Sequence, residues 1–149
     1  MTETKSSETS PKPRPGPRRT GPPARTAPLP VTADRKEALA SARRVVELAA
    51  DKKAADIVLL EVAALTTVAD YFVICSGSSE RQLGAVADGI VEGLKGDGTR
   101  LVAREGAPGS HWLLLDFGAV IVHVMAPPER DYYQLERLWS EAPLLLRVQ

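Results

Sequence analysis

The pattern of hydrophobic and polar positions predicts alternating helices and strands along most of the chain. Residues 33–53 predict a helix, because hydrophobic side chains recur there every three or four residues, at Leu39, Ala42, Val46 and Ala49. Thr32 or Asp34 is the expected cap of this helix. The apolar run of residues 56–62 predicts a strand that is buried on both faces, and residues 71–76 predict a second strand.

A second helix is predicted to begin at Ser79, because Gln82 stands three residues later, as a capping box requires. This helix runs to about Lys95, and Gly96 and Gly98 are expected to end it, since glycine commonly follows the last helical residue.

The most apolar stretch, residues 111–125, predicts a hairpin around Phe117 and Gly118. Aspartate opens turns and glycine accepts a positive φ, so Asp116-Phe117-Gly118 is interpreted as a turn. The same letters occur in protein kinases, but the other kinase motifs are missing from this short chain.

The register of this hairpin remains open at the level of sequence. A two-residue turn would place Trp112 opposite His123, whereas a turn with a glycine bulge would place it opposite Val122. In either case Trp112 and Asp116 share one face of their strand, because side chains alternate along a strand. If no helix covers that face, it forms an apolar patch with an acidic rim, which is typical of a protein interface. Trp112 is otherwise a core residue.

Residues 101–105 predict a further strand, and residues 128–142 predict a last helix, which Pro127 and Pro128 would start. Helices interleaved with about five strands indicate an α/β domain with a mixed sheet flanked by helices. We expect this domain to span residues 34–149. Residues 1–33 hold eight of the 12 prolines and few apolar side chains, so we expect a disordered tail there, rich in proline and arginine.

Composition and charge narrow the functional classes. The chain has 19 basic and 19 acidic residues. Residues 1–36 hold eight of the basic residues and three of the acidic ones, so the remainder has 11 basic and 16 acidic residues. An acidic domain repels free nucleic acid and suits a basic protein partner, although the basic tail allows a weak tether to RNA. A chain with a single cysteine forms no intrachain disulfide. Its apolar runs have neither the pattern of a signal peptide nor the length of a membrane span. We therefore expect a cytoplasmic protein.

Chemistry-bearing residues are sparse. The turn before Ser79 offers either a plain helix cap or a phosphate site of the kind used by nucleotidyltransferases, but Asp88 stands alone where such enzymes need paired carboxylates. His111 and His123 have neither the spacing of metal ligands nor a nucleophile elbow nearby, and Cys75 lies in an apolar strand. We therefore expect no catalytic residue, no metal and no cofactor.

Four blocks of the sequence together resemble the ribosomal silencing factor family, also called Iojap-like. They are residues 69–82 (ADYFVICSGSSERQ), Glu105-Gly106, residues 111–124 (HWLLLDFGAVIVHV) and residues 130–139 (RDYYQLERLW). Their order and spacing agree with the family over residues 37–142, and the tail lies outside the resemblance.

The resemblance implies a nucleotidyltransferase-like α/β fold without catalytic carboxylates. It also implies a translational repressor that binds the large ribosomal subunit through ribosomal protein fourteen, blocks joining of the small subunit when nutrients are limiting, and forms a homodimer when free. The glycines Gly77, Gly106 and Gly118 match backbone positions of the family, and Leu135 and Trp139 match core positions. The matching candidates for partner contact are Trp112, Asp116, His123, Arg130, Tyr133 and Glu136.

Overall fold

Helices and strands follow one another along residues 33–107 and 109–149, which are the part of the chain that this computed structural model describes. The elements are α1 (Ala33–Asp51), β1 (Ala55–Glu61), β2 (Tyr71–Ser76), α2 (Glu80–Gly96), β3 (Ala103–Glu105), β4 (Trp112–Asp116), β5 (Val120–Met125), α3 (Pro127–Tyr133), α4 (Leu135–Leu138) and β6 (Leu144–Val148). The predicted tail lies outside the described residues, except for Ala33, which begins α1.

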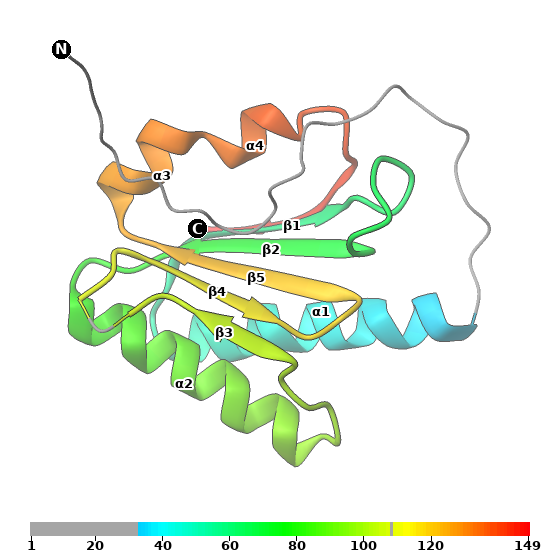
Figure 1. Ribbon diagram of the computed structural model, residues 1–149, viewed down its shortest axis with the longest axis horizontal. Coiled ribbons are helices and arrows are strands. Elements are labelled where there is room, and N and C mark those ends of the chain that lie inside the picture. Colours follow the sequence, from blue (N-terminus) through cyan, green and yellow to red (C-terminus); the bar gives the residue numbers. More distant parts are fainter. Residues whose placement is uncertain (1–32, 108) are drawn as a thin grey trace, which may run out of the picture.

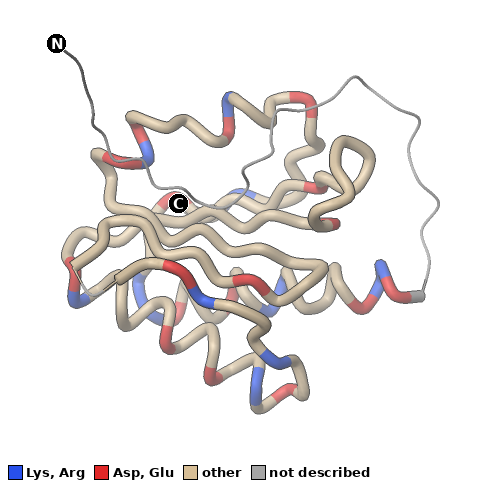
Figure 2. Tube along the Cα trace, viewed as in Figure 1, with Lys and Arg blue, Asp and Glu red and all other residues tan. Residues whose placement is uncertain are grey.

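The strands form one mixed sheet in the order β3-β4-β5-β2-β1-β6 (Figure 1). The two central strands, β2 and β5, run parallel, and the other neighbours are antiparallel. Every residue of β2 and β5 is buried, and both strands lack Lys, Arg, Asp and Glu, so they are tan at the centre of Figure 2. The expected mixed α/β fold is confirmed, with six strands in place of about five.

Two hydrophobic clusters lie on opposite faces of the sheet. On one face, α1 and α2 pack against side chains such as Val73 and Val122. On the other face, Leu135 and Trp139 of the α3–α4 segment pack against Phe72 and other strand residues. Figure 1 shows these two helical layers on either side of the sheet. Burial of both faces explains why the central strands are continuous apolar runs.

The beginning of α2 joins it to the end of α1. Ser79 caps the helix as predicted, because its Oγ accepts a hydrogen bond from the Gln82 backbone N–H at 3.0 Å. The Gln82 side chain then accepts from the Ser78 N–H at 2.7 Å and donates to the Lys53 carbonyl at 2.9 Å. At α1, Asp34 lies inside the first turn, so this one of the two expected caps is excluded, and the other, Thr32, lies outside the described residues.

The hairpin register differs from both alternatives that the sequence left open. Trp112 pairs with Met125, because the two-residue turn is Gly118-Ala119 and the Phe117 N–H donates to the Val120 carbonyl at 2.9 Å. Gly118 has a φ of 91°, and its N–H donates to Asp116 Oδ1, so the interpretation of this segment as a turn is confirmed. The register is two residues away from the expected pairing with His123. A shift of two preserves the faces, and Trp112 and His123 remain diagonal neighbours.

The last predicted helix is wrong in its extent. It breaks into α3 and α4 at Gln134, which has the left-handed backbone conformation (φ 48°, ψ 55°). The break turns Leu135 and Trp139 onto the sheet, where both are buried as expected. The chain then forms β6, which was not predicted, at the edge beside β1. Leu144, Leu145 and Leu146 of β6 are all exposed, so the strand lacks the alternation by which a half-buried strand is recognised.

Gly106 provides a test of the β3–β4 connection. It has a φ of 117°, and a Cβ there would lie 2.6 Å from Leu113 Cδ2 and 2.9 Å from the Trp112 carbonyl oxygen. We expect Gly106→Ala to lower the free energy of unfolding by about 2 kcal/mol, because the backbone conformation is costly for alanine and the space is filled. Urea denaturation measures the change.

Gly84→Ala is the matched control, since Gly84 lies within α2 and a Cβ there meets no atom within 4 Å. That variant should gain about 0.5–1 kcal/mol of stability, as glycine does when replaced by alanine inside a helix. Equal effects of the two substitutions would contradict the assigned geometry at Gly106.

Candidate functional site

Trp112 begins β4 and is only partly buried, on the sheet face that α3 and α4 cover in part. Its indole ring lies 4.8 Å from the Tyr133 ring of α3 and 5.8 Å from the His123 ring of β5, measured between centroids. The indole Nε1–H donates a hydrogen bond to His123 Nδ1 at 3.2 Å. Three of the residues expected to contact a partner are therefore in one cluster.

The cluster belongs to a row of rings that leads from the surface into the core. Successive centroids along Tyr132, Tyr133, Trp112, His123, Phe72 and Trp139 lie 4.8–5.8 Å apart. Tyr132 at one end is 76% exposed, whereas Trp139 at the other end is 3% exposed. Tilted and edge-to-face contacts at these distances are the favourable geometries for aromatic pairs. The exposed end of the row is thus supported by the core.

His123 is fully buried in the middle of this row. Burial lowers its pKa to about 3, because the imidazolium would lose its hydration. A neutral imidazole has one donor and one acceptor nitrogen, and Nδ1 accepts from Trp112, so Nε2 bears the hydrogen. Nε2 has no hydrogen-bond partner among the described residues. Because His123 is fully buried, it does not reach the surface of the described part of the chain.

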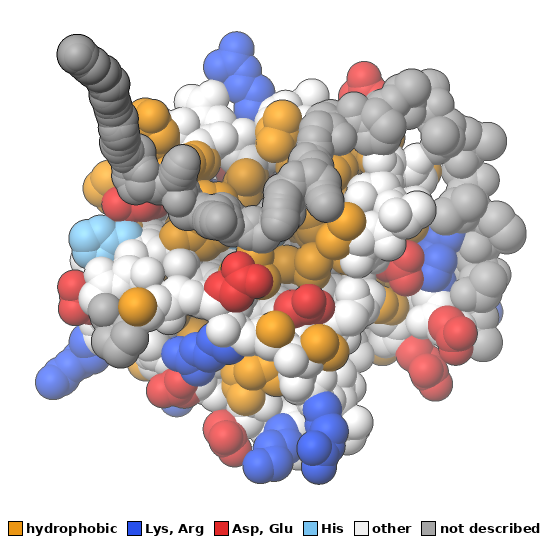
Figure 3. All heavy atoms as spheres, in the orientation of Figure 1, with side chains coloured by type: hydrophobic (Ala, Val, Ile, Leu, Met, Phe, Trp, Pro, Cys, Tyr) orange, Lys and Arg blue, Asp and Glu red, His pale blue; other side chains and the backbone are white. Residues whose placement is uncertain are grey.

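Acidic side chains project from the sheet face that carries Trp112. Glu105 of β3 pairs with Leu114, and Asp116 pairs with Ala103, so both carboxylates project from the face that carries Trp112. Glu105 is exposed and Asp116 is partly exposed. Figure 3 shows acidic side chains among apolar ones in the middle of this face, over β3 and β4. The expected apolar patch required a face without helices, and α3 and α4 cover part of this face: Leu114 is buried, while Trp112, Asp116 and Glu105 keep some exposure.

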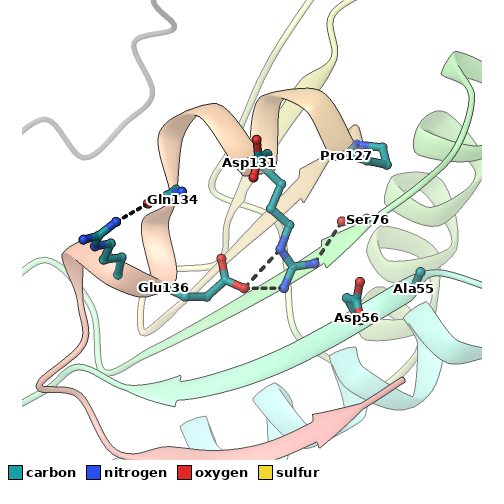
Figure 4. Close-up of a pocket in the computed structure, with 9 residues that line it drawn as sticks. Ala55, Asp56, Ser76, Pro127, Asp131, Gln134 and Glu136 are labelled. Carbon is teal, nitrogen blue, oxygen red and sulfur yellow. Dashed lines mark hydrogen bonds and ion pairs between the residues drawn. The ribbon is translucent and has the colours of Figure 1, made fainter.

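Arg130 of α3 and Glu136 of α4 form a second cluster, at the end of β2. The buried Arg130 guanidinium donates to Glu136 Oε2 at 2.7 and 3.2 Å and to Ser76 Oγ at 2.9 Å (Figure 4). This pair spans the break at Gln134 and ties both short helices to the end of β2. Around it lies an open pocket of about 430 Å³, lined by Ala55, Asp56, Ser76, Pro127, Arg130, Asp131, Gln134, Glu136 and Arg137.

The six residues expected to contact a partner thus fall into three groups. Trp112, His123 and Tyr133 are together, and Arg130 and Glu136 are together. Asp116 is at the far end of β4, about 13 Å from Trp112 along the strand. Sequence reasoning missed the place of Glu105 beside Trp112, which depends on strand pairing, and the place of Tyr132, for which the pattern offers no signal.

Comparisons with known proteins identify the family. The model of the family described as "Ribosomal silencing factor during starvation" matches residues 35–148. The chain belongs to the ribosomal silencing factor family. It is 44% identical over 94 residues to ribosomal silencing factor RsfS of Bacillus subtilis, a match that covers 63% of this chain and 80% of the relative.

Solved structures agree with this fold. A crystal structure of a protein from Chromobacterium violaceum is similar with a TM-score of 0.67 and 36% identity, over 68% of this chain and 85% of that one. A structure from Bacillus halodurans has a TM-score of 0.63 and 35% identity, over 74% of this chain and 98% of that one. Membership of the family gives the chain a regulatory, ribosome-associated silencing role and confirms the resemblance seen in the sequence.

Two backbone N–H groups in the turn between β2 and α2 already donate hydrogen bonds within the chain. The Gly77 N–H donates to the Met125 carbonyl at 3.2 Å, and the Ser78 N–H donates to Gln82 Oε1 at 2.7 Å. A phosphate at a helix N-terminus needs such N–H groups free. Asp88 is exposed and paired with Arg104 at 2.8 Å, on the outside of α2. These contacts favour the plain helix cap over a phosphate site.

The environments of Cys75 and His111 indicate no catalytic role for either side chain. Burial raises the pKa of the Cys75 thiol to about 12, which keeps it protonated and unreactive. His111 lies at the surface, with Nδ1 3.3 Å from Glu129 Oε2. Within residues 33–107 and 109–149, no group of three or more histidine, cysteine, aspartate or glutamate side chains is arranged to hold a metal ion. No helix in those ranges is both long and apolar enough to cross a membrane.

The buried, neutral His123 predicts a specific dependence of stability on pH. Its ordinary pKa of 6.5 applies to the unfolded chain, which therefore binds a proton below pH 6.5 that the folded chain does not bind until about pH 3. The stabilisation is present above pH 6.5 and is lost as the pH falls towards 3. Between about pH 7 and about pH 5, the loss due to this one group is about 2 kcal/mol.

His123→Leu removes this titration and leaves the carboxylates unchanged. Urea denaturation of both proteins at the two pH values should show the wild type losing about 2 kcal/mol more than the variant. Parallel losses in the two proteins would mean that His123 is protonated in the folded state.

Proposed function

We propose that the chain binds the large ribosomal subunit through its ribosomal protein fourteen and sterically blocks joining of the small subunit. Translation then falls when nutrients are limiting. The match to the family model over residues 35–148 is the observation that carries this proposal. The mechanism needs no chemistry, since a bound protein excludes the other subunit by its volume. We accordingly propose a cytoplasmic repressor that is not an enzyme and uses no cofactor.

The surface around Trp112 is the proposed contact with the ribosomal protein. Trp112 lies against the partly exposed Tyr133, and the exposed Tyr132 follows next in the row. Such aromatic side chains offer apolar area at little cost in side-chain entropy, and they dominate interface energetics. The Glu105 carboxylate near Trp112 and the Asp116 carboxylate at the far end of β4 suit a basic partner and disfavour free nucleic acid. The rest of the domain is also acidic, since residues 37–149 hold 16 acidic and 11 basic residues.

The six candidate residues divide into two roles in this proposal. Trp112, Asp116, Tyr133 and Glu136 are partly exposed and are proposed to touch the partner. His123 and Arg130 are buried, with 0% and 9% exposure, and are proposed to hold the contact residues in place. The alternative of a nucleotidyltransferase-like nucleotide-binding protein gains no support from the turn at Gly77, where the Gly77 and Ser78 N–H groups already donate within the chain.

A sucrose gradient of the purified protein mixed with separated ribosomal subunits tests the function. We expect the protein to travel with the large subunit and the peak of whole ribosomes to shrink as its concentration rises. Protein that stays at the top while whole ribosomes form normally would overturn the proposal. Travel with the small subunit alone would overturn the assigned partner.

A charge reversal tests the proposed surface. We expect Glu105→Lys to weaken binding to the large subunit by about 1 kcal/mol or more, roughly a fivefold rise in Kd, because it places a cation against a basic partner. Glu92→Lys is the matched control, since Glu92 is exposed on α2, behind the opposite face of the sheet, and the change in net charge is the same. Equal binding by the two variants would place the contact elsewhere.

We also propose that the free protein is a homodimer, paired through the β6 edge of the sheet. Leu144, Leu145 and Leu146 are 38–49% exposed on this edge strand, and an antiparallel pair of such edges is self-complementary. Light scattering should give twice the chain mass, and Leu145→Lys should lower it to that of one chain. A monomeric wild type would refute the dimer, and a dimeric variant would refute this edge.

A further inference from the structure

We propose that His123 is a positioning residue for Trp112: by accepting the indole N–H, it holds the Trp112 ring in the orientation that binds the partner. It acts through Trp112 and does not touch the partner itself. This inference rests on the proposed function, in which the Trp112 surface meets the large ribosomal subunit.

The geometry restricts both rings. His123 Nδ1 receives the Trp112 Nε1–H at 3.2 Å, and the other side of the imidazole packs edge-on against Phe72, with centroids 5.1 Å apart and an interplanar angle of 73°. Tyr133 lies against the indole at 4.8 Å. The imidazole is therefore held by the core, and the indole is held by the imidazole and by α3.

A fixed indole matters because Trp112 is only partly buried. A side chain at the surface loses rotamer freedom when a partner binds, and that loss subtracts from the affinity. A hydrogen bond formed before binding removes part of this cost, since the indole is already ordered. The strand alone does not provide this order, because Trp112 is the first residue of β4.

The hydrogen bond requires an unprotonated Nδ1. Burial lowers the pKa of His123 to about 3, so the ring remains an acceptor at physiological pH. Two charged groups of α3 have assigned partners: Arg130 is paired with Glu136 of α4, and Glu129 is paired with the surface His111. None of the hydrogen bonds or ion pairs assigned to these groups involves the imidazole.

Two substitutions of His123 separate position from stability. His123→Leu has a similar volume and no acceptor, whereas His123→Asn places a carbonyl oxygen close to the position of Nδ1. Ile121→Val is the matched control, because Ile121 is a buried residue on the same strand and the same face but pairs with Asp116 at the other end of β4. The probe for binding is the purified large ribosomal subunit.

The expected result is a loss of affinity that does not follow stability. His123→Leu should bind the large subunit about fivefold more weakly, which corresponds to about 1 kcal/mol, the usual net worth of one hydrogen bond. His123→Asn should recover much of this loss, although the smaller side chain makes the fold less stable. Ile121→Val should lose stability and keep its affinity.

Nuclear magnetic resonance of the indole N–H groups gives a readout that needs no ribosome. The chain has two tryptophans, so two indole signals are expected, and Trp112→Phe assigns them. In His123→Leu the Trp112 signal should shift upfield and exchange faster with solvent, while the Trp139 signal stays. In His123→Asn the Trp112 signal should return towards its position in the wild type.

The outcomes distinguish this inference from the proposed function. Trp112→Ala should lower the affinity about 30-fold, as for a central interface residue. If it does and His123→Leu binds like the wild type, the positioning role is overturned and the proposed surface stands. If Trp112→Ala itself binds normally, the proposed surface fails, and His123 positioning for this partner fails with it. Affinity that falls in proportion to stability in all His123 and Ile121 variants would show a merely structural role.

Discussion

Burial of the two central strands on both faces is the constraint on which the rest of the structure depends. A polar group in such a position needs a hydrogen-bond partner, because its hydration is lost. Two polar side chains, Ser76 and His123, lie there on the face of α3 and α4. Arg130 donates to Ser76 and Trp112 donates to His123. Arg130 of α3 and Trp112 of β4 thus provide the hydrogen-bond donors for the two buried polar side chains.

The same two contacts organise the surface that we assign to the ribosome. Arg130 and Tyr133 are three residues apart on α3, so one short helix both closes the polar cluster at Ser76 and packs against Trp112. The ion pair of Arg130 with Glu136 then crosses the break at Gln134 and directs α4 onto the sheet. A protein that acts by steric exclusion benefits from this arrangement, because a rigid surface loses little entropy on docking.

Local signals predicted most of the elements, and long-range contacts account for the exceptions. The period of α1, the Ser79 cap of α2 and the turn at Gly118 depend on neighbouring residues, and all three were correct. The break at Gln134 was not predictable, because the residues around it suit a continuous helix, and the Arg130–Glu136 pair that spans the break is a tertiary contact. The leucines of β6 are all exposed and show no alternation in burial, and the pairing that places β6 beside β1 is a long-range contact.

The candidate site divides in the same way between sequence and tertiary structure. By itself, the sequence determined the fold class, the family and the face shared by Trp112 and Asp116, because alternation along a strand needs no knowledge of its neighbours. Only the tertiary structure decided that Trp112 pairs with Met125, that Glu105 joins its face, and that His123 and Arg130 are buried. The physical reason is that exposure and pairing depend on what the rest of the chain places against a residue, and the letters around that residue do not contain this information.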